Sequence, residues 1–204
     1  MIRAVVFDQG KVRCTSANEA IREDISRTLG VDKQIVEELW TELVAGKLGR
    51  GEYGEEEFWL EFYARSGATR PLPPGESLLV REMRRLHSLI SGVVEIGDEL
   101  VAKSRKVAIL SNTIPPHAKF EKSLGHYGTN LTVVLSCDPD VRARKPERRI
   151  YEIILSRLGL SPEQIVIVDD DENYKEAVLS FGIKWLTFKD AVKLRKDLSN
   201  LGLL

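Results

Sequence analysis

Five short apolar runs, rich in valine and isoleucine, constrain the fold of this chain more than any other feature of its sequence. Short β-branched runs of this kind are typical of strands, and helical patterns separate the later ones. Strands that alternate with helices form parallel sheets whose faces the helices cover. The sequence therefore predicts an α/β fold with a parallel sheet, whose strands cover residues 4–7, 107–110, 132–136, 165–168 and 185–188.

The segment between the first predicted strand and the second has a different pattern. It contains no comparable apolar run, and its apolar residues recur at helical spacing. Glycines at 46–51 and prolines at 71–74 interrupt the pattern. The predicted helices cover residues 17–29, 33–44, 55–63 and 77–90. We therefore expect a helical subdomain over residues 16–96, inserted into a core formed by residues 1–15 and 97–204.

Composition and charge narrow the range of partners. The chain has 204 residues, of which 43% are hydrophobic, and its 30 basic and 31 acidic residues give a net charge of −1. Because lysine and arginine form no large cluster, we expect no nucleic-acid and no membrane partner. No basic and apolar leader precedes the first strand, so we expect a cytoplasmic location. The two cysteines, Cys14 and Cys137, lack metal-ligand spacing, and we expect reduced core residues.

Polar side chains follow the predicted strands at the points where each strand ends. In an open parallel sheet, ligands bind in the crevice beyond the carboxyl ends of the strands. A lysine directly before a proline, at an expected helix start, adds a positive charge to this set. We therefore expect one site at this edge of the sheet. Its candidate residues are Asp8, Ser111, Asn112, Lys145, Asp169 and Asp170.

Four motifs link this set to a known family. FDQGKV, ILSNT, RKP followed by IY, and IVIVDDDEN occur in this order along the chain. In order and approximate spacing they resemble the four motifs of the haloacid dehalogenase-like (HAD) hydrolases. The group with a glycine two positions after the first aspartate, which includes phosphatases of sugar and other small phosphates, is the most similar. The resemblance implies a Rossmann-like core, with the helical insertion as the cap of this superfamily.

The resemblance also implies a reaction. It indicates a phosphatase that hydrolyses a small phosphorylated metabolite, such as a sugar phosphate. Asp8 is the implied nucleophile, which attacks phosphorus to form an aspartyl phosphate that water then cleaves. Ser111 and Asn112 are expected to donate hydrogen bonds to the phosphoryl oxygens. Lys145 is expected to hold the same group as a point charge and so to contribute to catalysis.

A cluster of three carboxylates predicts a metal ion. Asp8, Asp169 and Asp170 would repel one another strongly unless a cation lay between them. Mg²⁺ prefers oxygen ligands and would shield the phosphate from the attacking carboxylate. By the resemblance, the metal-site residues are Asp8, Asp170 and the backbone carbonyl of Gly10, with Asp169 adjacent or acting through water.

Two positions depart from the usual family pattern. Most phosphatases of the superfamily carry a second aspartate, a proton donor, where this chain has Gly10. Lys11, Gln9 or a cap residue could supply the proton instead, or the leaving group could depart without much help, as in a sugar 1-phosphate or an acyl phosphate. In the last motif, Tyr174 stands at the usual asparagine position and Asn173 precedes it.

Alternatives stay open at this stage. A protein that keeps the fold but has lost turnover, and serves in binding or regulation, would explain Gly10 and Tyr174. A metal-free 2-haloacid dehalogenase would use the same Asp8, but the paired Asp169 and Asp170 would repel an anionic substrate.

Several conspicuous residues have simpler interpretations. Asp171 is expected to cap a helix. The aromatic residues of the insertion suit its own core better than a substrate-binding wall: Trp40, Phe58, Trp59 and Phe62. The histidines show no ligand spacing and are expected on surfaces or edges: His87, His117 and His126.

Overall fold

The sheet of the protein has five parallel strands. The computed structural model describes residues 1–204, and the strand order is β3-β2-β1-β4-β5. Every predicted strand is present, which confirms the α/β fold. The strands are β1 (Ala4–Phe7), β2 (Lys106–Ser111), β3 (Thr132–Leu135), β4 (Ile165–Asp169) and β5 (Lys184–Thr187).

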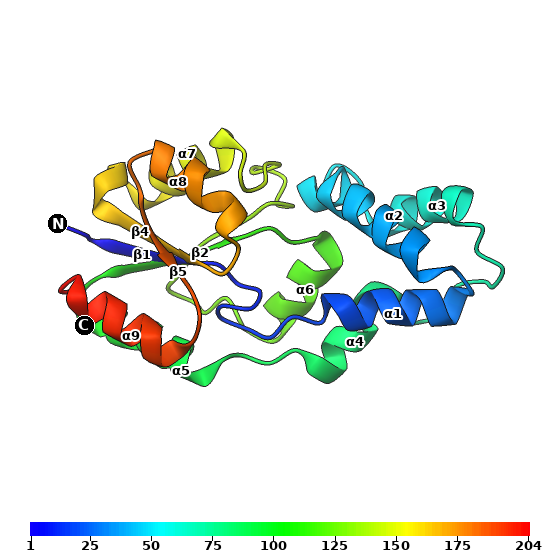
Figure 1. The fold of residues 1–204 in the computed structure, drawn as a ribbon, viewed down its shortest axis with the longest axis horizontal. Helices are drawn as coiled ribbons and strands as arrows, with labels where there is room; N and C mark the ends of the chain where they lie inside the picture. The colour runs from blue at the N-terminus through cyan, green and yellow to red at the C-terminus, as the bar shows by residue number, and fades with distance from the viewer.

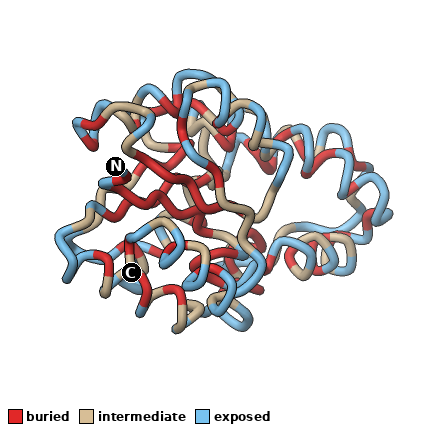
Figure 2. The backbone as a smooth tube through the Cα atoms, turned by 60° about the vertical axis from the view of Figure 1, so that its left-hand side comes forward, coloured by how far each residue is buried: buried red, intermediate tan, exposed pale blue.

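Helices cover both faces of this sheet (Figure 1). Ala4 and Val6 pack on the side of α7 (Arg148–Leu158) and α8 (Lys175–Ser180). Val5 and Phe7 point to the opposite side, where α5 (Ser91–Ala102) and α9 (Ala191–Asn200) lie. Successive side chains of a strand point to opposite faces, so this strand is apolar throughout because both of its faces are covered. Figure 2 shows the strands as the buried centre of this half of the molecule.

A group of four helices lies beyond the carboxyl ends of the strands, at the right of Figure 1. It contains α1 (Asn18–Leu29), α2 (Lys33–Ala45), α3 (Glu55–Ser66) and α4 (Leu78–Leu86), with a short 3-10 helix at Leu48–Arg50. Trp40, Phe58, Trp59 and Phe62 are buried in the apolar cluster of this group. The aromatic residues are therefore core residues of the insertion, as expected.

The chain returns to the sheet earlier than the sequence suggests. The helix expected over residues 77–90 ends at Leu86, and α5 begins at Ser91. Val93 and Ile96 pack against the sheet with Val5 and Phe7, not with the helical group. Helix α5 thus belongs to the core layer, and we move the proposed end of the cap from residue 96 to about residue 90.

The remaining elements connect the strands. Helix α6 (Pro115–Ser123) follows β2, and two further 3-10 helices cover Pro162–Gln164 and Glu172–Tyr174. Helix α7 begins at Arg148, two residues after the proline that was expected to start it. Asp171 caps the 3-10 helix after β4 by accepting a hydrogen bond from the backbone N–H of Asn173, as predicted. None of the helices is both long and apolar enough to span a bilayer.

Candidate active site

Strand register brings the predicted site residues to one edge of the sheet. Phe7 pairs with Ile109 on one side and with Val168 on the other, so Asp8 emerges between the ends of β2 and β4. A cavity of about 440 Å³ opens there. Every candidate residue lines it: Asp8, Gly10, Ser111, Asn112, Lys145, Asp169 and Asp170. Their spatial convergence is a structural fact, and their individual roles stay predictions.

Lys145 lies between two of the carboxylates. Its Nζ is 2.6 Å from Asp8 Oδ1 and 2.5 Å from Asp169 Oδ2. The side chains of Lys145 and Asp169 are almost completely buried. A buried charge is tolerated only when it is paired, and here one ammonium group pairs with two carboxylates.

For both Asp8 and Lys145, burial and the charge of the other residue shift the pKa in opposite directions. Burial raises the pKa of Asp8 to about 6, although Lys145 opposes the shift. Burial alone would lower the pKa of Lys145, but the carboxylates of Asp8 and Asp169 outweigh it and raise that pKa above its ordinary value. Lys145 therefore stays a cation at neutral pH, and Asp8 is mostly ionised there.

Ser111 and Asn112 follow β2 but have different surroundings. Ser111 lines the cavity, and its hydroxyl forms no hydrogen bond with another protein group, so it is free to bind a ligand. The Asn112 side chain accepts from the backbone N–H of Lys145 and donates to the carbonyl of the same residue. Its other contact is the Tyr174 hydroxyl, 3.3 Å away. The side-chain amide of Asn112 is therefore engaged by protein groups. We propose that the backbone N–H of Asn112, not its side chain, donates to the phosphate.

The three carboxylates offer oxygen ligands for a cation. One oxygen atom from each of Asp8, Asp169 and Asp170 lies within 4.8 Å of the others. Asp169 has both oxygens engaged, one by Lys145 and the other by the backbone N–H of Asp171. Asp170 is partly exposed, and its only side-chain partner is the exposed Lys11, at 3.7 Å. An all-oxygen set with open positions suits a hard ion such as Mg²⁺.

Comparisons with known proteins agree with this geometry. The family model described as haloacid dehalogenase-like hydrolase matches residues 2–179. The chain belongs to the haloacid dehalogenase-like hydrolases.

Solved structures share the fold of this chain. An HAD-like family hydrolase of Porphyromonas gingivalis has a TM-score of 0.75 at 21% identity over 98% of both chains. An HAD family enzyme of Bacteroides thetaiotaomicron, in complex with magnesium and inorganic phosphate, has a TM-score of 0.74 at 19% identity over 93% of this chain and 96% of the other. At these identities the likeness shows the fold alone.

Flavin mononucleotide hydrolase 1 of Arabidopsis thaliana is 27% identical over 124 residues, which are 59% of this chain and 49% of the relative. The chain spans about half or less of the length of the curated relatives that it matches.

The first departure from the HAD pattern leaves open space. A Cβ atom built on Gly10 would have no heavy atom within 4 Å, and the residue does not have a left-handed backbone. Gln9, one alternative proton donor, is buried, and its side chain lies 3.4 Å from Arg13. Lys11 does line the cavity. Steric crowding therefore does not explain why this HAD hydrolase lacks an aspartate at position 10.

The second departure is resolved by the structure. Tyr174, not Asn173, lines the cavity, and the Lys145 Nζ lies 5.1 Å from the centroid of its ring. Asn173 instead donates to Asp171 through both its backbone N–H and its amide. An aromatic ring beside the ammonium group stabilises its charge. Of the two residues considered for this position, Tyr174 is therefore the one that lies beside Lys145 in the cavity.

Several residues near the site were missed or misplaced by sequence reasoning. A second cavity of about 470 Å³ adjoins the first and is lined by Trp40, Val44 and Arg144, among others. Arg144 lies next to Lys145 in a run of basic residues, and nothing in that run marked Arg144 as a cavity residue. The histidines were expected on surfaces or edges, but His117 is buried and its Nε2 donates to the Leu79 carbonyl at 2.8 Å. The side chain of His87 is also buried.

Proposed function

We propose that this HAD hydrolase is a magnesium-dependent phosphatase that acts on a small phosphorylated metabolite through an aspartyl phosphate on Asp8. The observation that carries the proposal is the position of Lys145. Its ammonium group lies within hydrogen-bond distance of the Asp8 carboxylate, at the floor of a polar cavity. Phosphoryl transfer needs a nucleophile beside a fixed positive charge, because the transferred group carries several negative charges.

The first step uses the chain's own groups. A carboxylate oxygen of Asp8 forms a bond to phosphorus while the bond from phosphorus to the leaving oxygen breaks. Lys145 and the free hydroxyl of Ser111 would hold the phosphoryl oxygens in line. In the second step water attacks phosphorus, the bond from phosphorus to Asp8 breaks, and inorganic phosphate leaves. The carboxylate of Asp8 is thereby restored.

The metal-site residues fit a hard cation. Asp8, Asp170 and the carbonyl of Gly10 would hold Mg²⁺, and Asp169 would act indirectly because both of its oxygens are engaged. When bound, the ion would neutralise charge on the phosphate as it meets Asp8.

The leaving group would lie toward the second cavity. This space is bounded by Trp40 and Val44 of α2 on one side and by Arg144 on the other, so it offers both an apolar wall and a cation. Gly10 supplies no proton donor, so a leaving oxygen of low basicity departs most easily. A sugar 1-phosphate or an acyl phosphate has such a leaving group. The flavin phosphate named for the Arabidopsis relative would also present a ring to the apolar wall.

The proposal is tested by measuring phosphate release from a panel of sugar phosphates, acyl phosphates and flavin mononucleotide, with magnesium and with a chelator. We expect release that requires magnesium and is lost in Asp8→Asn. Halide release from a 2-haloacid in the chelator would instead show a dehalogenase. A folded protein that binds magnesium and releases phosphate from none of the panel would favour the binding or regulatory role.

A further inference from the structure

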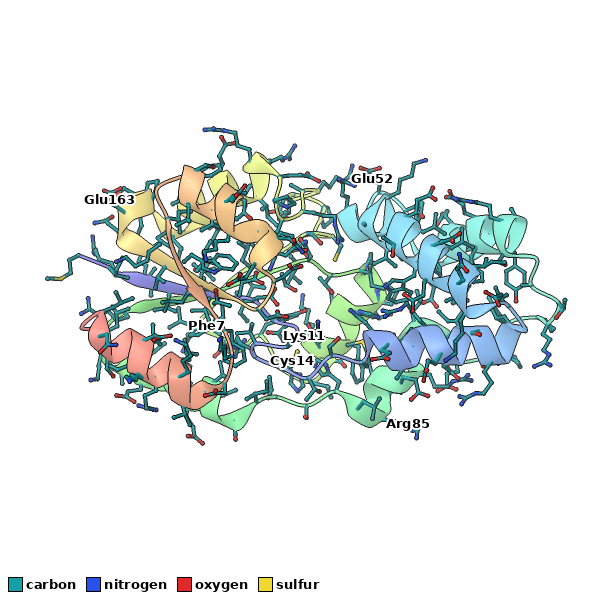
Figure 3. The ribbon with its side chains drawn as sticks, viewed as in Figure 1. Phe7, Lys11, Cys14, Glu52, Arg85 and Glu163 are labelled. Carbon is teal, nitrogen blue, oxygen red and sulfur yellow. The ribbon has the colours of Figure 1, made fainter.

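A second polar cluster lies where the helical cap joins the core. The two linkers, residues 14–17 and 87–90, run side by side there. The backbone N–H of Thr15 donates to the Ser88 carbonyl at 2.9 Å, and that of Ile90 donates to the Arg13 carbonyl at 2.8 Å. Figure 3 shows Cys14 at this junction, between the sheet and the helical group.

Four side chains with metal-binding atoms converge at the junction. Cys14 comes from the first linker, His87 from the second, Glu121 from the last turns of α6, and His126 from the turn after α6. Glu121 Oε1 is 3.7 Å from Cys14 Sγ and 3.3 Å from His87 Nε2. His87 Nε2 is 3.1 Å from His126 Nδ1.

The separations of Glu121 from Cys14 and from His87 match those between neighbouring ligand atoms around a tetrahedral zinc ion. Zinc lies about 2.3 Å from sulfur, about 2.0–2.1 Å from imidazole nitrogen and about 2.0–2.2 Å from carboxylate oxygen. At tetrahedral angles, neighbouring ligand atoms are then roughly 3.3–3.6 Å apart. The distances from Glu121 Oε1 to Cys14 Sγ and to His87 Nε2 lie close to this range. Cys14, His87 and Glu121 each offer one atom within 4.8 Å of the other two.

Burial and charge also favour a cation at this place. Cys14 is 1% exposed and Glu121 is 5% exposed, so a carboxylate beside a thiol is held away from water. A thiolate and a carboxylate carry two negative charges, and the neutral imidazole of His87 carries none. A divalent ion would therefore balance the charge of its ligands, and the buried Arg13, which donates to the His126 carbonyl, adds one positive charge nearby.

The surroundings of the cluster orient its carboxylate. The Tyr127 hydroxyl donates to Glu121 Oε2, which leaves Oε1 facing Cys14 and His87. Such a hydrogen bond to the second oxygen of a ligating carboxylate fixes its direction. The set of sulfur and nitrogen donors differs in kind from the all-oxygen cluster around Asp8, and it suits zinc rather than magnesium.

We propose that Cys14, His87 and Glu121 bind a zinc ion that joins both cap linkers to helix α6, with His126 beside His87 at the edge of the site. The ion would tie three segments of the chain together, so it would restrict the movement of the cap relative to the sheet. The cluster also lies close to the catalytic loop, because Cys14 forms an isolated β-bridge with Gly10. The site is separate from the proposed magnesium site, and its test does not depend on turnover.

The test measures metal content and a spectroscopic signature in the full chain. The protein is stripped with a chelator, incubated with zinc or cobalt in the presence of excess magnesium, and desalted. We expect one zinc per chain, and the cobalt form should show thiolate-to-metal charge-transfer absorption. Cys14→Ser should lose both the zinc and the absorption. Cys137→Ser is the matched control, because Cys137 is the other buried cysteine and lies outside the cluster; it should keep both.

The proposal is overturned if the wild-type protein holds no zinc, or if its cobalt form lacks the charge-transfer absorption. Equal metal content in Cys14→Ser and Cys137→Ser would overturn it too, as would displacement of the zinc by excess magnesium, which would place the ion among the carboxylates around Asp8. Should Cys14→Ser fail to fold, the cobalt spectrum of the wild-type protein decides. His126→Gln, at the more exposed edge of the cluster, is a second variant that is expected to weaken zinc binding.

Discussion

The side chain of Asn112 forms two hydrogen bonds with the backbone of Lys145. Its Oδ1 accepts from the Lys145 N–H at 2.8 Å, and its Nδ2 donates to the Lys145 carbonyl at 3.0 Å. The pair connects the end of β2 to the segment that carries the cation of the site. The position of the Lys145 ammonium group therefore depends on a side chain more than thirty residues earlier in the chain.

Replacing Asn112 should displace Lys145. We expect Asn112→Ala to lower kcat/KM by about 10- to 100-fold, as residues that orient a reacting group do. Asn173→Ala is the matched control, because Asn173 bonds only Asp171 and does not line the cavity. Steady-state kinetics on the preferred substrate measures both variants. Equal rates in the two variants would remove the positioning role of Asn112.

Removing the charge of Lys145 should cost stability as well as rate. In Lys145→Met, Asp8 and Asp169 would face each other with no buried cation between them, and breaking a buried ion pair costs about 3 kcal/mol or more. Lys11→Met removes an exposed ammonium 3.7 Å from Asp170 and should change the free energy of unfolding by less than about 1 kcal/mol. Urea unfolding in a chelator compares the variants. Similar unfolding free energies in both would contradict this account of Lys145.

An aspartate at position 10 should speed the hydrolysis of substrates with poor leaving groups. The space around a Cβ at Gly10 is open, so Gly10→Asp is expected to fold. A placed general acid contributes about 10²–10⁴-fold, and we expect a gain of at least about 10-fold for alkyl phosphates. Gly10→Asn has the same shape without the proton and is the control. An equal effect of both substitutions, or none, would show that proton donation at this position does not limit turnover.

The buried His117 should make stability depend on pH. Burial lowers the pKa of His117 to about 4, although its hydrogen bond to the Leu79 carbonyl opposes the shift, while the unfolded chain keeps the ordinary value of 6.5. Because the folded pKa is depressed, the unfolded state binds the proton first as the pH falls. The stability associated with neutral His117 is complete above pH 6.5 and is lost progressively toward pH 4.

His117→Gln isolates this contribution. The glutamine amide can still donate to the Leu79 carbonyl, but it does not titrate. Between about pH 8 and about pH 5, the wild-type protein should lose about 2 kcal/mol more of its unfolding free energy than the variant does. Denaturant unfolding at several pH values measures the difference. Parallel pH profiles would show that His117 is not the group responsible.

The sheet and the convergence of the candidate residues at its edge could be predicted because they depend on local patterns. Buried strands need apolar residues on both faces, and parallel strands end at one edge, so Asp8 and Asp169 were expected at the same edge of the sheet. That they are neighbours follows from the pairing of β1 with β4. The bond between Asn112 and Lys145 could not be predicted, because it joins two loops whose conformations depend on tertiary packing. The same holds for Cys14, His87 and Glu121, which are distant in sequence and meet only once the linkers lie against α6. The spacing of the histidines along the sequence did not indicate that His87 lies beside Cys14 and Glu121.

The central claim is that Asp8 becomes phosphorylated during turnover. The most direct measurement is mass spectrometry of the peptide that contains Asp8, after the protein is mixed with substrate and magnesium and quenched in acid. The account predicts a phosphoryl group on Asp8 that hydroxylamine removes, and none in Asp8→Asn. Steady phosphate release with no phosphorylated Asp8 at any quench time, together with release that persists in Asp8→Asn, would contradict it.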